Sequence, residues 1–229
     1  MKLLISLACV LFSFEMARAQ QEISQAQLAQ LLKAAGARSP WRINLGVGLS
    51  GFKEMKVSAM RTKTADSKSE GKMNQDLMES VNLSVNSAYL PENSFGFIGG
   101  VTYDTDSRFG RGAMQSKGET SKIEGADDRL STLSLSANLV YRGSALYVPV
   151  GANLTTYFYT PDPDDEARYK YNGGVGAQAG LGFFAGPTAS IEFWYRAQAF
   201  SMSKETDKEG VYFDRAQVTS ASMMAKYWF

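Results

Sequence analysis

The last eleven residues of the chain, residues 219–229, read TSASMMAKYWF, and this stretch decides the fold. Every second residue back from the end is apolar: Phe229, Tyr227, Ala225, Met223 and Ala221. The residues between them include Lys226, Ser222 and Ser220, which are polar. Because alternate side chains of an extended chain point to opposite faces, the stretch predicts a β-strand with one apolar and one polar face.

The same alternation recurs seven times upstream. It covers residues 41–50, 80–89, 95–104, 133–142, 146–158, 169–183 and 191–199. Long polar connections alternate strictly with short turns: the long ones are 52–76, 106–128, 161–168 and 204–215, and the short ones are 91–94, 143–144 and 185–187. Eight strands joined in this way predict one all-β domain over residues 41–229, an eight-stranded antiparallel up-and-down β-barrel.

Composition decides which face of the barrel points inward, because a soluble barrel such as a lipocalin also alternates. The polar face is mostly Gly, Ser, Asn, Gln and Thr, which suit a narrow interior better than a solvated surface. The apolar face is almost free of charge over about ten residues per strand, enough to cross a bilayer at a tilt. Aromatic residues gather at the turn end (Trp41, Tyr89, Phe95, Tyr141, Phe183, Tyr227, Phe229) and at the loop end (Tyr103, Phe158, Tyr169, Tyr171). A closed transmembrane barrel is therefore predicted, since lipid cannot hydrogen-bond a free strand edge.

Residues 1–40 precede the predicted barrel. A positive start, an apolar run and the sequence Ala17-Arg18-Ala19 predict a cleaved signal peptide over residues 1–19. The single cysteine, Cys9, lies inside it, so no disulfide is expected afterwards. Residues 20–40 are predicted as a short helix and linker, with apolar residues at helical spacing from Leu28 to Ala35. The helix could lie in the periplasm, enter the barrel as a plug, or lie on the membrane surface.

The whole-chain composition excludes several kinds of function. The formal charge of the 229 residues is +1, so a general attraction to nucleic acid is not indicated. The chain has no histidine, the commonest general base and a frequent metal ligand. The acidic segment 162–166 lacks the glycine of a calcium loop, because Ala167 stands at that position. We therefore expect no cofactor and no metal site.

The strand count, the loop asymmetry, the aromatic girdles and the aromatic terminus of residues 41–229 resemble the OmpA/OmpX-like class of eight-stranded outer-membrane β-barrels. The resemblance implies a monomer in the bacterial outer membrane, surrounded by lipid and lipopolysaccharide. It also implies that Tyr227 and Phe229 form the signal that the barrel assembly machinery reads. Some barrels of this kind are lipid A-modifying enzymes that rely on a histidine, which is missing here. A non-catalytic protein is therefore predicted.

Four charged residues are predicted to face the barrel interior as a charge network: Arg42, Glu192, Arg196 and Lys226. Glu192 and Lys226 lie near the turn ends of neighbouring strands and are expected to meet at similar depth. Arg42 would join them once the first and last strands pair. The network has a structural interpretation, as charges that compensate one another, and a functional one, as the selectivity lining of a small pore.

A second group of charges, Lys53, Lys56, Arg61 and Lys63, makes the first long loop basic. The loop is either a solvated extracellular hairpin or a surface that contacts the anionic lipopolysaccharide of the outer leaflet. Two functions follow from these features. The first is a structural, surface-interaction barrel whose loops contact lipopolysaccharide or another surface. The alternative is a narrow, porin-like channel gated by the helix, although Trp194 and Met224 are expected to obstruct it.

Overall fold

A computed structural model describes residues 40–57, 60–62, 68–69, 71–116, 119–161, 168–205 and 210–229. The predicted signal peptide and the predicted N-terminal helix lie outside these residues. In the part of the chain that the structure does describe, no helix is long and apolar enough to cross a bilayer.

The described residues form thirteen strands in one antiparallel sheet. They are β1 (Trp41–Val57), β2 (Met60–Thr62), β3 (Lys68–Ser69), β4 (Gly71–Leu77), β5 (Ser80–Tyr89), β6 (Ser94–Ser116), β7 (Glu119–Ile123), β8 (Ala126–Arg142), β9 (Leu146–Thr160), β10 (Arg168–Tyr171), β11 (Gly174–Phe184), β12 (Ala189–Glu205) and β13 (Gly210–Trp228).

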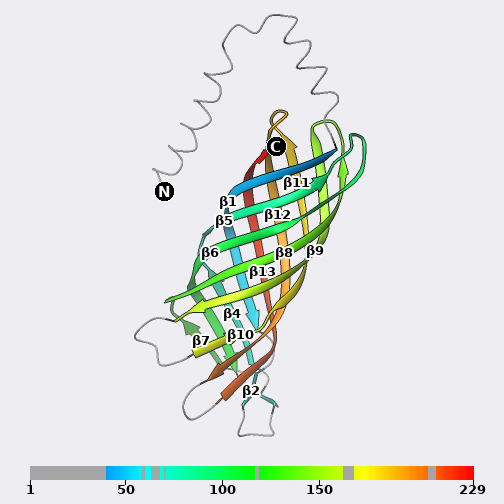
Figure 1. The fold of residues 1–229 in the computed structure, drawn as a ribbon. Helices are drawn as coiled ribbons and strands as arrows, with labels where there is room; N and C mark the ends of the chain where they lie inside the picture. The colour runs from blue at the N-terminus through cyan, green and yellow to red at the C-terminus, as the bar shows by residue number, and fades with distance from the viewer. Residues whose placement is uncertain are drawn as a thin grey trace, which may run out of the picture. The chain divides into compact units, whose positions relative to one another are not determined.

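Eight of these strands pair in a closed ring (Figure 1). The order is β1, β5, β6, β8, β9, β11, β12 and β13, and β13 returns to β1 with Gly46 opposite Lys226. Short turns join the strands at the end that carries the C-terminus, and the longer connections lie at the opposite end. The predicted eight-stranded antiparallel barrel is confirmed.

The strands run further at the loop end than the sequence predicts. Residues 52–76 and 106–128 were expected to be loops, and this prediction is wrong over much of their length. β1 continues to Val57, which pairs with Met73 of β4, and β6 continues to Ser116, which pairs with Glu119 of β7. The expected loop 204–215 is likewise shortened, because β12 and β13 pair as far as Glu205 and Gly210. The barrel therefore has an extension beyond the eight predicted spans.

A β-bulge at Gly51 separates this extension from the rest of β1. Ser50 pairs with Ser222 and Phe52 pairs with Ala221, so Gly51 is an extra residue relative to β13. One extra residue exchanges the two faces of a strand. Even-numbered residues of β1 face inward up to Ser50, whereas Lys53 and the odd-numbered residues after it face inward beyond the bulge.

The two parts of the barrel have opposite polarity. Between the turns and the bulge, the exterior is a belt of exposed apolar side chains on all eight strands, such as Leu45, Leu135 and Phe193. Beyond the bulge, the exposed residues include charged ones such as Lys56 and Arg108. At the bulge the interior changes in the opposite sense, from the polar side chains of the barrel middle to apolar ones. A belt of this kind faces hydrocarbon, whereas the extension has the polarity of a protein in water.

Candidate functional site

The barrel interior carries the candidate site, and its side chains form successive layers along the barrel axis. At the turn end is an apolar cluster, here called the turn-end plug: Ala88, Leu90, Ile98, Val140, Tyr147 and Trp228. Polar side chains fill the middle of the barrel. Inside the extension is a second apolar cluster, here called the loop-end core: Met55, Val57, Leu77, Phe109, Leu130, Tyr157, Phe200, Met202, Ala216 and Val218.

The turn-end plug is built on aromatic rings. The Trp228 ring lies 6.1 Å from the Tyr147 ring and 5.7 Å from the Phe184 ring, between centroids. Its indole Nε1 donates a hydrogen bond to the Ser190 hydroxyl at 2.7 Å. Arg142 covers the Phe184 ring, with its guanidinium carbon 4.9 Å from the centroid. Trp228 and Tyr147 are fully buried, so the plug closes this end of the interior.

A buried ion pair lies next to the plug. Lys226 Nζ is 2.7 Å from Glu192 Oε2, and both side chains are excluded from solvent. Glu192 also accepts hydrogen bonds from the Tyr147 hydroxyl and, at 2.6 Å, from the Trp194 indole. The ammonium of Lys226 lies 5.7 Å from the Trp194 ring centroid. Three donors therefore compensate one carboxylate, as a charge in a low-dielectric interior requires.

Side-chain amides form the next part of the polar middle. Gln178 Nε2 donates to Asn138 Oδ1 at 2.7 Å, and Asn153 Nδ2 donates to Gln178 Oε1 at 3.2 Å. Gln198 Nε2 donates to Asn153 Oδ1 at 3.0 Å and to the Thr155 hydroxyl at 2.5 Å. These groups link β8, β9, β11 and β12 across the interior. Because each is satisfied by another side chain, the network fills space that a channel would leave to water.

A second group of buried charges lies where the polar middle meets the loop-end core. Lys53 Nζ is 3.5 Å from Asp104 Oδ2 and donates to the hydroxyls of Ser80 and Ser107 at 2.7 Å and 2.8 Å. Arg196 Nη1 is 4.0 Å from Asp104 Oδ1. Asp104 thus stands between two cations contributed by β1 and β12.

A small cavity lies beside these charges. Its volume is about 10 Å³, and Lys53, Asp104, Tyr157 and Arg196 are among the residues that line it. Nε of Arg196 is buried there and has no hydrogen-bond partner among the described residues. A space of this size holds about one water molecule, and a water would satisfy that donor.

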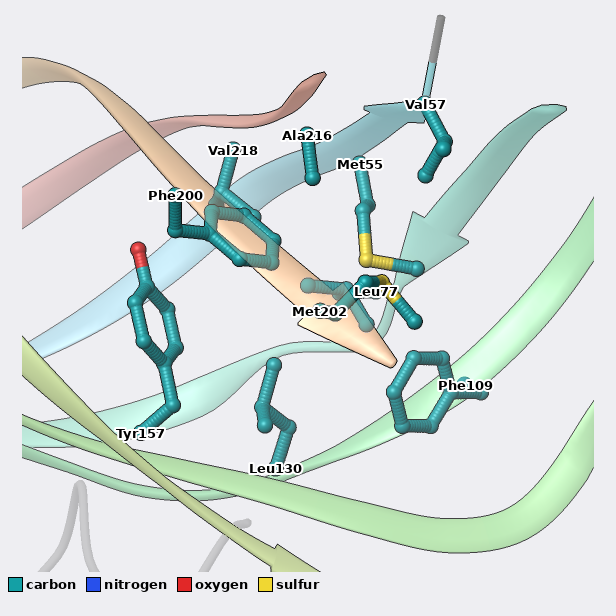
Figure 2. Close-up of a cluster of buried hydrophobic side chains, with 10 residues drawn as sticks. All are labelled: Met55, Val57, Leu77, Phe109, Leu130, Tyr157, Phe200, Met202, Ala216 and Val218. Carbon is teal, nitrogen blue, oxygen red and sulfur yellow. The ribbon is translucent and has the colours of Figure 1, made fainter. Parts of the chain in front are cut away.

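The loop-end core closes the interior on the other side (Figure 2). Its side chains come from strands on opposite sides of the barrel and point toward one another. The Tyr157 and Phe200 rings are 4.6 Å apart, and Tyr171 lies 5.9 Å from Phe200. Tyr171 therefore packs against this core, and its assignment to the loop-end aromatic girdle is corrected.

The structure divides the four residues of the predicted charge network. It brings Glu192 and Lys226 into contact. Arg196 is four residues beyond Glu192 on β12, roughly 13 Å along the strand, and lies with Asp104 instead. Arg42 lies at the turn end, where it donates to the Pro187 carbonyl at 3.4 Å and its guanidinium carbon is 6.0 Å from the Phe184 centroid. No single cluster therefore contains all four.

The residues predicted to contact lipopolysaccharide also differ in position. Lys53 is buried in the interior and cannot reach lipopolysaccharide, so this assignment is corrected; the bulge at Gly51 turned it inward. Lys56 is exposed on the exterior and lies 2.9 Å from Glu54. Arg61 belongs to β2, but its side chain, like the whole of Lys63, lies outside the described residues.

The C-terminal strand places Tyr227 and Phe229 on the exterior, with 45% and 68% of each residue exposed. Their rings are 5.0 Å apart and belong to the turn-end rim of the belt. The sequence interpretation missed Asp104, Tyr147 and Trp228 as interior partners. Strand alternation already placed Asp104 on the inward face, so its position, though not its partners, could have been recognised.

These features define the class. A closed ring of eight antiparallel strands has an apolar exterior rimmed by aromatic residues and a polar, filled interior, so the protein is an integral β-barrel of the bacterial outer membrane.

Comparison with known proteins adds the following similarities. No family model and no curated protein sequence matches the chain. The outer-membrane protein OprG from Pseudomonas aeruginosa is 14% identical, with a TM-score of 0.48, over 82% of this chain and 95% of that chain. Neisserial surface protein A is 13% identical, with a TM-score of 0.46, over 83% and 98%. Ail of Yersinia pestis, in complex with the heparin analogue sucrose octasulfate, is 15% identical, with a TM-score of 0.44, over 82% and 99%.

Proposed function

We propose that the protein is a non-conducting outer-membrane barrel whose extension contacts lipopolysaccharide or another surface. The observation that carries this proposal is the filled interior. Two apolar clusters and the polar middle occupy the described lumen, and the cavity beside Asp104 has a volume of only about 10 Å³. A hydrated ion needs a continuous path, which a space for about one water molecule does not provide.

The polarity of the extension supports the surface role. Its exterior carries charges of both signs, including the pairs Arg108–Asp127 at 3.8 Å and Arg129–Asp106 at 3.6 Å. The Ser131 hydroxyl, which donates to Asp106 at 2.7 Å, and Arg129 hold the pKa of Asp106 below its usual value. This interaction stabilises the fold above the ordinary carboxyl pKa and is lost as the pH falls. The extension thus presents a hydrogen-bonded, charged surface above the membrane.

A non-catalytic role is part of the same proposal. The sequence has no histidine, and within the described residues no three Asp, Glu, Cys or His side chains group as a metal site would require. The buried charges Lys53, Asp104, Glu192 and Lys226 are held in ion pairs with one another or with Arg196. A serine with no neighbouring base is a weak nucleophile.

The purified protein inserted into a planar bilayer is expected to give no steady ionic conductance, because the interior layers leave no continuous path. Insertion is verified separately by co-sedimentation with vesicles. The absence of current then means that the inserted barrel is closed, and not that insertion failed. A reproducible, ion-selective current that disappears in Arg196→Ala would overturn the proposal in favour of a channel.

Binding to lipopolysaccharide is tested by substituting the three remaining basic residues of the predicted contact, Lys56, Arg61 and Lys63. The variant Lys56→Gln/Arg61→Gln/Lys63→Gln is expected to bind lipopolysaccharide vesicles about a hundredfold more weakly, since each of the three basic groups near an anionic surface contributes about 1 kcal/mol. The matched control is Arg111→Gln/Lys122→Gln/Lys170→Gln, which removes three exposed positive charges elsewhere in the extension. Equal binding by the triple variant, the control and the unaltered protein would refute this contact and leave another surface as the partner.

A further inference from the structure

The small cavity beside Asp104 is surrounded by more positive than negative charge. Two buried cations, Lys53 and Arg196, lie within 4.0 Å of one buried carboxylate, that of Asp104. Two positive charges and one negative charge leave one positive charge uncompensated in this group. Because an uncompensated charge in a low-dielectric interior is costly, the excess favours the binding of an anion.

The other buried carboxylates of the described residues do not remove this excess. Glu192 pairs with Lys226. Asp128 lies on β8, four residues nearer the loop end than Thr132, whose hydroxyl donates to Asp104 at 3.2 Å. Four residues of extended strand span roughly 13 Å, so Asp128 is too far away to compensate the group.

The two cations differ in how well they are paired. Lys53 Nζ contacts the hydroxyls of Ser80 and Ser107 and the carboxylate of Asp104, three acceptors for the three donors of an ammonium. Arg196 reaches the same carboxylate only at 4.0 Å, through Nη1, and its Nε has no hydrogen-bond partner among the described residues. The uncompensated charge is therefore that of Arg196, and its free donor is a separate position on the planar guanidinium.

The cavity has room for one small ion. Its volume of about 10 Å³ holds about one water molecule and is too small for sulfate or phosphate. Four residues of the loop-end core also line it, and they separate it from the loop end of the barrel (Figure 2): Leu77, Leu130, Tyr157 and Val218. A water molecule in this space would accept the hydrogen bond from Arg196 Nε but would leave the charge uncompensated.

We propose that the cavity binds one chloride ion, which accepts the hydrogen bond from Arg196 Nε. The ion balances the second cation, so that Lys53, Asp104, Arg196 and the ion together are neutral. A monoatomic anion is closer in size to a water molecule than a polyatomic anion is. A hydrogen bond between two charged groups is also stronger than a neutral one, which favours the ion over water.

The proposal is tested by equilibrium unfolding of the full chain in urea and phospholipid vesicles, with sodium chloride replaced by sodium gluconate at constant ionic strength. Gluconate is too large for the cavity. An ion that binds only the folded state stabilises that state by mass action. Each tenfold rise in chloride above its dissociation constant should therefore lower the unfolding equilibrium constant about tenfold, or about 1.4 kcal/mol. If the unfolding of the unaltered protein does not depend on chloride, the cavity holds water and the proposal is wrong.

Two variants identify the site. Arg196→Gln removes the donor together with the excess charge, whereas Lys53→Met removes the excess charge and leaves the guanidinium in place. Both are expected to abolish the dependence on chloride, however stable each variant is by itself. The matched control is Arg129→Gln, which removes an exposed arginine 3.6 Å from Asp106 and is expected to keep the dependence. A dependence that persists in Arg196→Gln or in Lys53→Met would overturn the proposal.

The ion is located directly by anomalous X-ray diffraction from crystals of the unaltered protein grown in sodium bromide, in which bromide stands in for chloride. One anomalous peak is expected in the cavity, within hydrogen-bond distance of Arg196 Nε. A cavity without such a peak would contain water only, and the chloride site would be refuted.

Discussion

Lys226→Met is expected to lower the free energy of unfolding by about 3–5 kcal/mol, because it leaves the Glu192 carboxylate buried without its cation. The ion pair is 2.7 Å long and both side chains are fully buried, so water cannot replace the ammonium. The hydrogen bonds from Tyr147 and Trp194 remain, but they do not neutralise the charge. The measurement is urea-induced unfolding in phospholipid vesicles, followed by tryptophan fluorescence.

Two variants serve as controls for this result. Arg42→Met removes a half-buried cation at the turn end of the barrel. It is expected to lower the free energy of unfolding by less than about 1 kcal/mol. Lys226→Met/Glu192→Met removes both charges and is expected to recover much of the stability, because apolar residues replace a buried pair at little cost. If Lys226→Met were no more damaging than Arg42→Met, the pair would contribute nothing to the stability of the barrel.

Trp228→Ala is expected to cost about 3–5 kcal/mol in the same experiment, because it empties the centre of the turn-end plug. Only 1% of Trp228 is exposed, and its ring contacts Tyr147 and Phe184. The substitution also removes the donor to the Ser190 hydroxyl. The remaining tryptophans, Trp41 and Trp194, report the transition.

The neighbouring aromatic residues provide the contrast. The side chains of Tyr227 and Phe229 face outward. Tyr227→Ala and Phe229→Ala are therefore expected to change the unfolding free energy by much less than Trp228→Ala. If Tyr227 and Phe229 form the signal for the barrel assembly machinery, the two substitutions should instead reduce the amount of folded protein in the outer membrane of cells. A loss of stability as large as that of Trp228→Ala would assign Tyr227 and Phe229 to packing.

The sequence predicted the barrel well because its alternation is local. Each strand of the belt shows its two faces in residues such as Leu45 and Asn44 without reference to any other strand. The extension escaped prediction for the same reason. Beyond Gly51 the apolar residues move to the inner face, and charged residues such as Lys56 on the outer face made this part resemble a loop.

The contacts inside the barrel depend on register, which a single strand does not reveal. Glu192 and Lys226 were expected to meet because both lie near the turn ends of adjacent strands. Lys53 could not be paired with Asp104, since simple alternation without the bulge places it on the exterior. Arg42 was placed too close to Glu192, because depth was counted from the strand ends and the actual register sets Gly46 opposite Lys226.

The reversal of polarity at the bulge also determines how deeply the barrel is inserted in the bilayer. If the protein sank toward the periplasm, the charged outer face of the extension would enter hydrocarbon; if it rose, apolar side chains of the belt would enter water. Both displacements cost free energy, so one insertion depth along the membrane normal is favoured. A bilayer whose hydrocarbon layer is thicker than the belt would have to thin around the protein.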